Sequence, residues 1–206
     1  MVNSATLSHI EKRLLDPARR GTDELAGDHA FKSDWIDPDP KRVLRDAAVL
    51  VPIVDRPSGL SVVLTKRADH LNSHAGQVSF PGGGAEEGDG SLEETALRET
   101  EEEIGLSRDY ITLKGSLERY ETGTGFSIHP VVGFVREGFD LTIETGEVAE
   151  VFEVPLDFLM NPKNHLRHSA VWKGKRREYF AMPYGEYYIW GATAGMLVNL
   201  YKRVFA

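Results

Sequence analysis

Four glutamates, Glu99, Glu101, Glu102 and Glu103, lie directly before Gly105. If this segment is an α-helix, Glu99 shares a face with Glu102 at i+3 and with Glu103 at i+4. Like charges at those spacings cost roughly 0.2 to 0.5 kcal/mol per pair. Acids at the negative end of the helix dipole cost about 0.3 to 1 kcal/mol each. The arrangement is therefore unfavourable unless something positive offsets it.

A solvated acidic surface is the plain interpretation of a glutamate-rich helix. A bound divalent cation would instead convert the repulsion into coordination, and Mg²⁺ or Mn²⁺ prefers carboxylate oxygens and bridges readily to phosphate. We therefore predict that Glu99, Glu102 and Glu103 are metal ligands. Glu101 points about 200° around the helix from Glu99 and is excluded from this site.

The elements around the glutamates can be predicted from the apolar pattern. Ser91 opens a segment without Gly or Pro that ends at Gly105, and Ser91 with Glu94 forms a capping box, so a helix is expected over 91–104. Glycines precede this helix at positions 82, 83, 84, 88 and 90. Before the glycines, strands are expected at 47–54, 61–67 and 77–80.

The rest of the chain alternates strand and helix patterns. Further strands are expected at 111–122, 129–136, 147–156, 166–172 and 177–182, and a closing helix begins near Thr193. The N-terminus predicts an amphipathic helix over 4–15, with Ser4 as its cap, followed by an irregular arm over 16–42. We expect the chain to divide into this segment, 1–42, and a compact domain, 43–206. The helix could pack on the domain or on a partner, including a second copy in a homodimer.

Composition excludes several classes of function. A chain of 206 residues with 41% hydrophobic residues suits one ordinary domain. Its net charge of −8 argues against nucleic-acid binding, and its lack of cysteine excludes disulfides, thiolate zinc sites and a cysteine nucleophile. The longest apolar run, 47–54, is too short to span a membrane, and no signal peptide is evident. A soluble cytoplasmic protein is expected.

The segment from Arg98 to Leu106 resembles the second half of the Nudix hydrolase signature, G-x5-E-x7-R-E-U-x-E-E-x-G-U, where U is a bulky aliphatic residue. It matches every fixed position except the first U, which is Thr100. The first half departs. Counted from Gly83 the acid is Asp89, with eight residues rather than seven before Arg98; counted back from Arg98, Gly90 stands in its place.

Residues 63–83 are similar to the additional motif of the coenzyme A diphosphatase branch, roughly LLTxRSxxLxxxxGxVxFPGG. The departures are Val63 for leucine and Ala68 for serine. Two short segments, Gly-Glu-Val at 146–148 and Trp-Gly-Ala-Thr at 190–193, also look like this branch. The two main motifs span 63–106, about a fifth of the chain.

The resemblance implies a Nudix-type α/β/α sandwich with a mixed β-sheet between helices. It also implies that Glu99, Glu102 and Glu103 bind Mg²⁺ or Mn²⁺ and that Arg98 orients a glutamate through a charge-assisted hydrogen bond. A surface salt bridge is the alternative for Arg98.

Other residues are candidates for contact with the substrate. Gly82, Gly83 and the glycine at 84 let the backbone approach a ligand or a metal, or form a plain turn. Arg67 could bind a substrate phosphate or be solvated.

The implied reaction is in-line attack of water on a diphosphate, with no covalent intermediate. The general base is Glu99 or Glu147, with histidines 70, 74 and 129 as alternatives. For coenzyme A the products would be 3′,5′-ADP and 4′-phosphopantetheine. Two alternatives remain: a Nudix hydrolase of ADP-ribose, a dinucleoside polyphosphate or a nucleoside triphosphate, and a nucleotide-binding module without catalysis.

Overall fold

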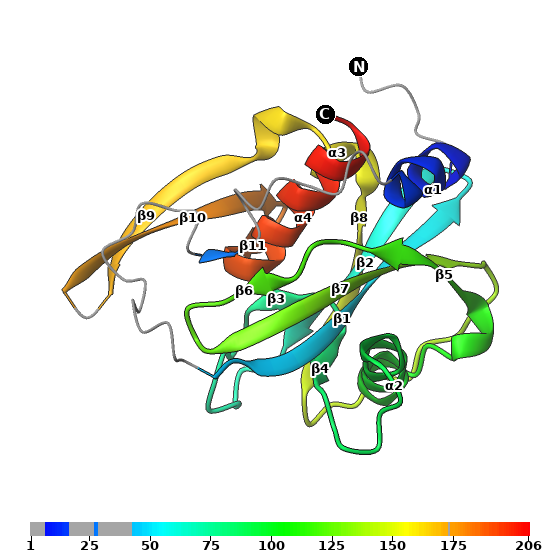
Figure 1. Cartoon of the computed structure of the whole chain (residues 1–206), viewed down its shortest axis with the longest axis horizontal. Coiled ribbons are helices and arrows are strands. Elements are labelled where there is room, and N and C mark those ends of the chain that lie inside the picture. The colour runs from blue at the N-terminus through cyan, green and yellow to red at the C-terminus, as the bar shows by residue number, and fades with distance from the viewer. Residues whose placement is uncertain (1–6, 17–26, 29–42, 173) are drawn as a thin grey trace.

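The computed structural model describes residues 7–16, 27–28 and 43–206 except 173. The predicted Ser4 cap and most of the predicted arm, 17–26 and 29–42, lie outside the described residues. The described part forms a large mixed sheet, a small second sheet and helices packed against them (Figure 1).

The large sheet has the central order β3-β2-β1-β7-β5, with β4, β6 and β8 pairing with β1, β7 and β2. Its β1 and β7 strands run parallel, and its other pairs are antiparallel, so the predicted mixed sheet is confirmed. The strands are β1 (Arg45–Arg56), β2 (Gly59–Arg67), β3 (Val78–Ser79), β4 (Gly82–Gly84), β5 (Ile111–Ser116), β6 (Tyr120–Glu121), β7 (Phe126–Val135) and β8 (Val148–Pro155).

The small sheet has the order β11-β10-β9. It consists of β9 (Leu166–Trp172), β10 (Lys175–Tyr184) and β11 (Tyr187–Trp190). The helices are α1 (Leu7–Leu15), α2 (Leu92–Ile104), α3 (Leu156–Leu159) and α4 (Gly191–Val204), with short 3₁₀ turns η4 (Arg108–Tyr110) and η5 (Pro162–Asn164). No helix in this described part of the chain is both long and apolar enough to cross a membrane.

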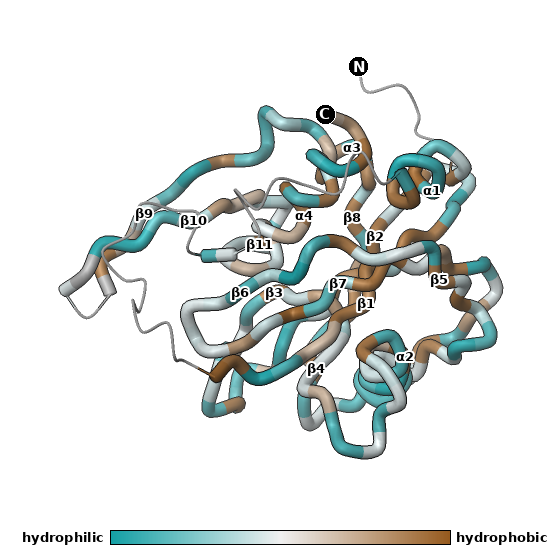
Figure 2. Tube along the Cα trace, viewed as in Figure 1, coloured by the Kyte–Doolittle hydropathy of each residue, from teal (hydrophilic) through white to brown (hydrophobic). Residues whose placement is uncertain are grey.

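Strand β1 explains the layering, because both of its faces are buried. Val49 and Val51 belong to the core that also holds α1 and α4, whereas Ala48 and Leu50 pack in the core beneath α2. A strand covered on both sides needs a continuous apolar run, which is visible as the brown centre of Figure 2. The sheet therefore lies between α2 on one side and α1 with α4 on the other, as the predicted α/β/α arrangement requires (Figure 1).

The ends of α2 lie where the sequence predicts them. The Ser91 hydroxyl accepts a hydrogen bond from the Glu94 backbone N–H at 3.3 Å. Gly105 ends the helix in the left-handed conformation, with φ of 67°. The Glu94 carboxylate, which a full capping box would turn back to Ser91, accepts a hydrogen bond from Arg108.

The N-terminal helix α1 packs on the domain. Ile10 and Leu14 are 1% and 3% exposed and belong to the same core as α4. The guanidinium of Arg203 donates to the Leu14 carbonyl at 2.7 Å, which ties the two helices together. The division of the chain at residue 42 stays a prediction.

Candidate metal and active site

Glu103 is the most buried acid of the acidic helix, with 4% of its surface exposed. Its Oε2 accepts a hydrogen bond from the Gly82 backbone N–H at 3.1 Å, and Nη1 of Arg67 lies 3.7 Å from its Oε1. Burial raises the pKa of Glu103 to about 7, against the opposing effects of the Gly82 hydrogen bond and the Arg67 charge. The Gly82 hydrogen bond and the Arg67 charge therefore do not offset the cost of ionising this buried carboxyl group.

Glu99 lies against Gly83. A methyl group built on Gly83 would meet the Glu99 carboxylate carbon at 2.5 Å, so this contact requires glycine. Burial raises the pKa of Glu99, hydrogen bonding to Arg98 lowers it, and the charges of Glu102 and Glu147 raise it further. Strand β4 therefore brings backbone directly against the two inner glutamates of α2.

The two outer glutamates of the helix point to different partners. Glu102, whose side chain is 61% exposed, accepts from Nη1 of Arg98 at 3.1 Å. Glu101 instead lies 3.5 Å from Nε of Arg108. Glu101 therefore faces Arg108, away from Glu99, which agrees with the angle of about 200° expected between Glu99 and Glu101 around the helix.

Gly82 is required for the pairing of two strands as well as for the hydrogen bond to Glu103. Its φ is 148°, and an added Cβ would lie 2.3 Å from the Ala48 carbonyl oxygen. Glycine is therefore needed for β4 to pair closely with β1, and that pairing directs the Gly82 N–H to Glu103.

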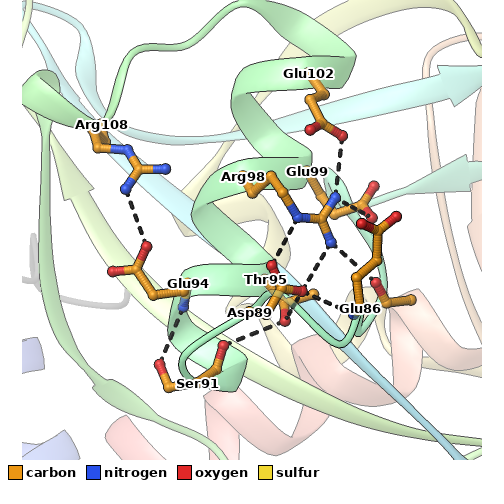
Figure 3. Close-up of polar contacts among 10 residues, drawn as sticks. Glu86, Asp89, Ser91, Glu94, Thr95, Arg98, Glu99, Glu102 and Arg108 are labelled. Atoms are coloured by element: carbon orange, nitrogen blue, oxygen red, sulfur yellow. Dashed lines mark hydrogen bonds and ion pairs between the residues drawn. The ribbon is translucent and has the colours of Figure 1, made fainter.

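Arg98 connects the loop to the glutamates (Figure 3). Its Nη1 donates to Glu99 at 2.9 Å and to Glu102, and its Nη2 donates to the Gly84 carbonyl at 3.2 Å. Its Nε and Nη2 also donate to the two carboxylate oxygens of Asp89 at 2.8 and 2.9 Å. The arginine thus bonds one acid of the loop and two acids of the helix.

Asp89 was singled out in the sequence only as a displaced signature acid. The structure directs it to Arg98, whose hydrogen bonds hold the pKa of Asp89 well below its usual range. In the sequence, Asp89 can be found by counting the signature from Gly83, which places the signature acid at this position.

Glu147 and the candidate histidines lie in different places. The charge of Glu147 raises the pKa values of both Glu99 and Glu103, and its backbone carbonyl accepts from the Ala68 N–H at 2.8 Å. His129 lies 3.5 Å from Glu93, in the first turn of α2, whereas Glu103 is in the last. His74 is exposed and bonds Gln77 at 2.9 Å, and His70 is exposed. Of these residues, Glu147 is the one beside the inner glutamates.

The candidate metal ligands suit a hard divalent cation, since Glu99, Glu102 and Glu103 offer only carboxylate oxygens. Glu99 and Glu103 favour a bound cation. Burial raises the pKa values of both, and added positive charge would stabilise their ionised forms. As the side chains lie, no three His, Cys, Asp or Glu of the described ranges are grouped closely enough to enclose a metal ion. Nη1 of Arg98 donates to both Glu99 and Glu102, so a metal ion bound by these two carboxylates would have to replace those hydrogen bonds.

The mixed sheet, the glycine strand β4 and the acidic helix α2 that follows it define the class of protein to which this chain belongs. A family model described as the NUDIX domain matches residues 44–173, and the chain belongs to the Nudix hydrolase family.

Its relatives include two proteins named Uncharacterized Nudix hydrolase NudL. The one from Yersinia enterocolitica is 39% identical over 158 residues, covering 77% of this chain and 80% of the relative. The one from Photorhabdus laumondii is 36% identical over 170 residues, covering 81% and 90%. A solved structure of a C. elegans Ap4A hydrolase is 20% identical, with a TM-score of 0.47 over 55% of this chain and 82% of that chain.

Proposed function

We propose that this Nudix protein hydrolyses the central diphosphate of coenzyme A or its derivatives, with Mg²⁺ or Mn²⁺ as cofactor. One observation carries the proposal: both ends of the 63–83 segment contact Glu103. Arg67 approaches it from the end of β2, and Gly82 donates to it from β4. The segment that resembles the coenzyme A branch and the helix that resembles the Nudix signature therefore meet at one carboxylate.

The two shorter branch-like segments support the same assignment, because both contact the 63–83 segment. Glu147 accepts a backbone hydrogen bond from Ala68. Thr193, 6% exposed, donates its hydroxyl to the Val78 carbonyl at 3.0 Å. The 63–83 segment is thus contacted by two segments that lie more than 60 residues further along the chain.

The candidate ligands are Glu99, Glu102 and Glu103. When bound there, a divalent cation would neutralise diphosphate charge and acidify a water molecule for in-line attack on phosphorus. The chain's own contribution would be a base for the water proton, either Glu99 or Glu147. Arg67 would meet a phosphate of the substrate, since a guanidinium suits phosphate geometry.

Attack of one water molecule on either phosphorus breaks the same anhydride bond and gives 3′,5′-ADP and 4′-phosphopantetheine. The net charge of −8 makes a small nucleotide held through a cation more suitable than a nucleic acid. Within this proposal, residues 43–206 form the hydrolase domain.

The test is a parallel assay of coenzyme A, ADP-ribose, NADH and dATP with Mg²⁺ or Mn²⁺, with products identified by mass. We expect 3′,5′-ADP and 4′-phosphopantetheine from coenzyme A, and strongly reduced turnover in Glu102→Gln, which controls for a contaminating hydrolase. Cleavage of ADP-ribose without cleavage of coenzyme A would leave a Nudix hydrolase of another substrate. No turnover of any compound would favour a nucleotide-binding module.

A further inference from the structure

The small sheet has an inner face that packs on the large sheet. On β11, Tyr187 stacks on Phe152 of β8, with ring centroids 3.6 Å apart, and Ile189 is fully buried. Because side chains alternate along a strand, Tyr188 and Trp190 point to the opposite, outer face.

This outer face carries a closed ring of four aromatic side chains: His168 of β9, Tyr179 of β10, and Tyr188 and Trp190 of β11. Each of them contacts two of the others, with ring centroids 5.2 to 6.4 Å apart. The Tyr188 hydroxyl also forms a hydrogen bond with Nδ1 of His168 at 2.7 Å. Tyr188 is nevertheless 40% exposed. Its ring is therefore held in one orientation by its neighbours and still presents a surface to a ligand.

The charge of the surrounding strands suits an anionic ligand. Residues 158–177, which include β9 and the start of β10, contain six Lys or Arg and neither Asp nor Glu, although the chain has a net charge of −8. The hairpin formed by β9 and β10 extends away from the large sheet (Figure 1). Burial and a hydrogen bond with Tyr179 raise the pKa of Tyr188 to about 12, so its hydroxyl stays uncharged at neutral pH. A nucleotide fits both features, because its base stacks on aromatic rings and its phosphates are attracted by positive charge.

Two contacts join the small sheet to the 63–83 segment, whose two ends contact the candidate metal site. Glu150 of β8, which accepts a hydrogen bond from β11, lies opposite Lys66 in the pairing of β8 with β2. Thr193, in the first turn of α4 directly after β11, donates to the Val78 carbonyl. The small sheet is thus fixed to the segment that the proposed function places at the diphosphate.

We infer that the outer face of the small sheet binds the adenine of coenzyme A, stacked on Tyr188, while the diphosphate lies at the candidate metal site. The inference rests on the proposed function and adds a specificity-determining residue to it. A ring that is already oriented loses little conformational freedom when a ligand binds. Removal of an aromatic ring on which a base stacks typically weakens binding by about 5- to 100-fold.

The experiment is calorimetric titration of the folded protein in EDTA with 3′,5′-ADP, which carries the adenine but no diphosphate bond, and in parallel with 4′-phosphopantetheine. Steady-state kinetics then give kcat and KM for coenzyme A with Mg²⁺. Tyr188→Leu removes the ring, and Tyr188→Phe keeps the ring without the hydroxyl. The matched control is Val171→Ala, which truncates a side chain that is 73% exposed on the other face of β9. Thermal unfolding of each variant reports loss of stability separately.

If the inference holds, Tyr188→Leu weakens 3′,5′-ADP binding by about 5- to 100-fold and leaves 4′-phosphopantetheine binding unchanged. KM for coenzyme A should rise by a similar factor with kcat nearly unchanged, since stacking stabilises the bound substrate and the transition state equally. Tyr188→Phe should retain most of the affinity, and Val171→Ala all of it.

Two results would overturn the inference. A lower melting temperature of Tyr188→Leu with unchanged affinity and KM would make the ring purely structural. Weaker 3′,5′-ADP binding with unchanged KM would show that the surface binds a nucleotide other than the substrate. Wild type that binds 3′,5′-ADP but cleaves no coenzyme A would instead refute the proposed function, and with it the assignment of the adenine to the substrate.

Discussion

Gly83 lies so close to Glu99 that a single methyl group on the glycine would meet the glutamate carboxylate at 2.5 Å. The obstructed atoms are the far end of a flexible side chain, so Gly83→Ala should displace Glu99 rather than unfold the protein. We expect a fall in kcat/KM of roughly tenfold or more, about 1.4 kcal/mol in transition-state stabilisation, with little change in melting temperature.

The neighbouring glycines provide matched controls for this substitution. A Cβ on residue 84 meets nothing within 4 Å, so alanine there should leave turnover and stability close to wild type. A Cβ on Gly82 would collide with backbone of β1 at positive φ, so Gly82→Ala should lower the melting temperature. Equal activity in the Gly83→Ala and residue-84 alanine variants would show that turnover does not depend on the position of the Glu99 side chain.

The second prediction separates two adjacent glutamates. Millimolar Mg²⁺ or Mn²⁺ should raise the melting temperature of the wild type, because a ligand of the native state stabilises it by mass action. Glu102→Gln should reduce this increase and depress turnover strongly. Glu101→Gln should retain both, since Glu101 faces Arg108. The measurement is thermal unfolding with and without metal; similar effects in the two variants would contradict the assignment of Glu102.

The third prediction concerns pH and the metal-free protein. The unfolded chain releases the Glu103 proton near its ordinary pKa of 4.5, but the folded protein retains it up to about 7. Between these values the folded state binds more protons, so this group's contribution to stability falls as pH rises. It is complete below about pH 4.5 and lost above about pH 7, and a difference of this size corresponds to on the order of 3 kcal/mol.

Denaturant unfolding in EDTA at a series of pH values measures this dependence. Glu103→Gln should flatten the decline between pH 5 and 7 relative to wild type, whereas Glu101→Gln should keep it. A Glu103→Gln curve parallel to the wild-type curve would mean that Glu103 ionises normally in the folded state.

The sequence predicted the parts of the fold that depend on local pattern. The helix over 91–104 was predicted within one residue, because Ser91 and Gly105 mark its ends chemically. The buried strand over 47–54 was recognisable from its continuous apolar run, and the structure extends it to Arg45–Arg56.

The missed features depend on tertiary contacts. No strand was predicted where β4 lies, because three consecutive glycines have no side-chain alternation and form a strand only through pairing with β1. The short β11 and α3 also escaped prediction. The Asp89–Arg98 pair could not be inferred, since it depends on how the loop folds back onto α2.

The last prediction concerns recognition of the substrate by Arg67. Its Nη1 lies 3.7 Å from Glu103, and its side chain is 26% exposed, so it is both anchored at the site and accessible. Removing the 3′-phosphate of coenzyme A should lower kcat/KM, because binding energy from remote groups can be used in the transition state. If Arg67 binds that phosphate, Arg67→Ala should abolish the preference for coenzyme A over dephospho-coenzyme A.

Comparing kcat/KM for both compounds in wild type and Arg67→Ala separates two roles of the arginine. A reader of the 3′-phosphate changes the ratio between the compounds. A residue that binds the central diphosphate, or that only supports Glu103, lowers both values equally, because both compounds contain the bond to be cleaved. An unchanged ratio in Arg67→Ala would therefore remove Arg67 as the reader of the 3′-phosphate and leave it a role at the diphosphate or beside Glu103.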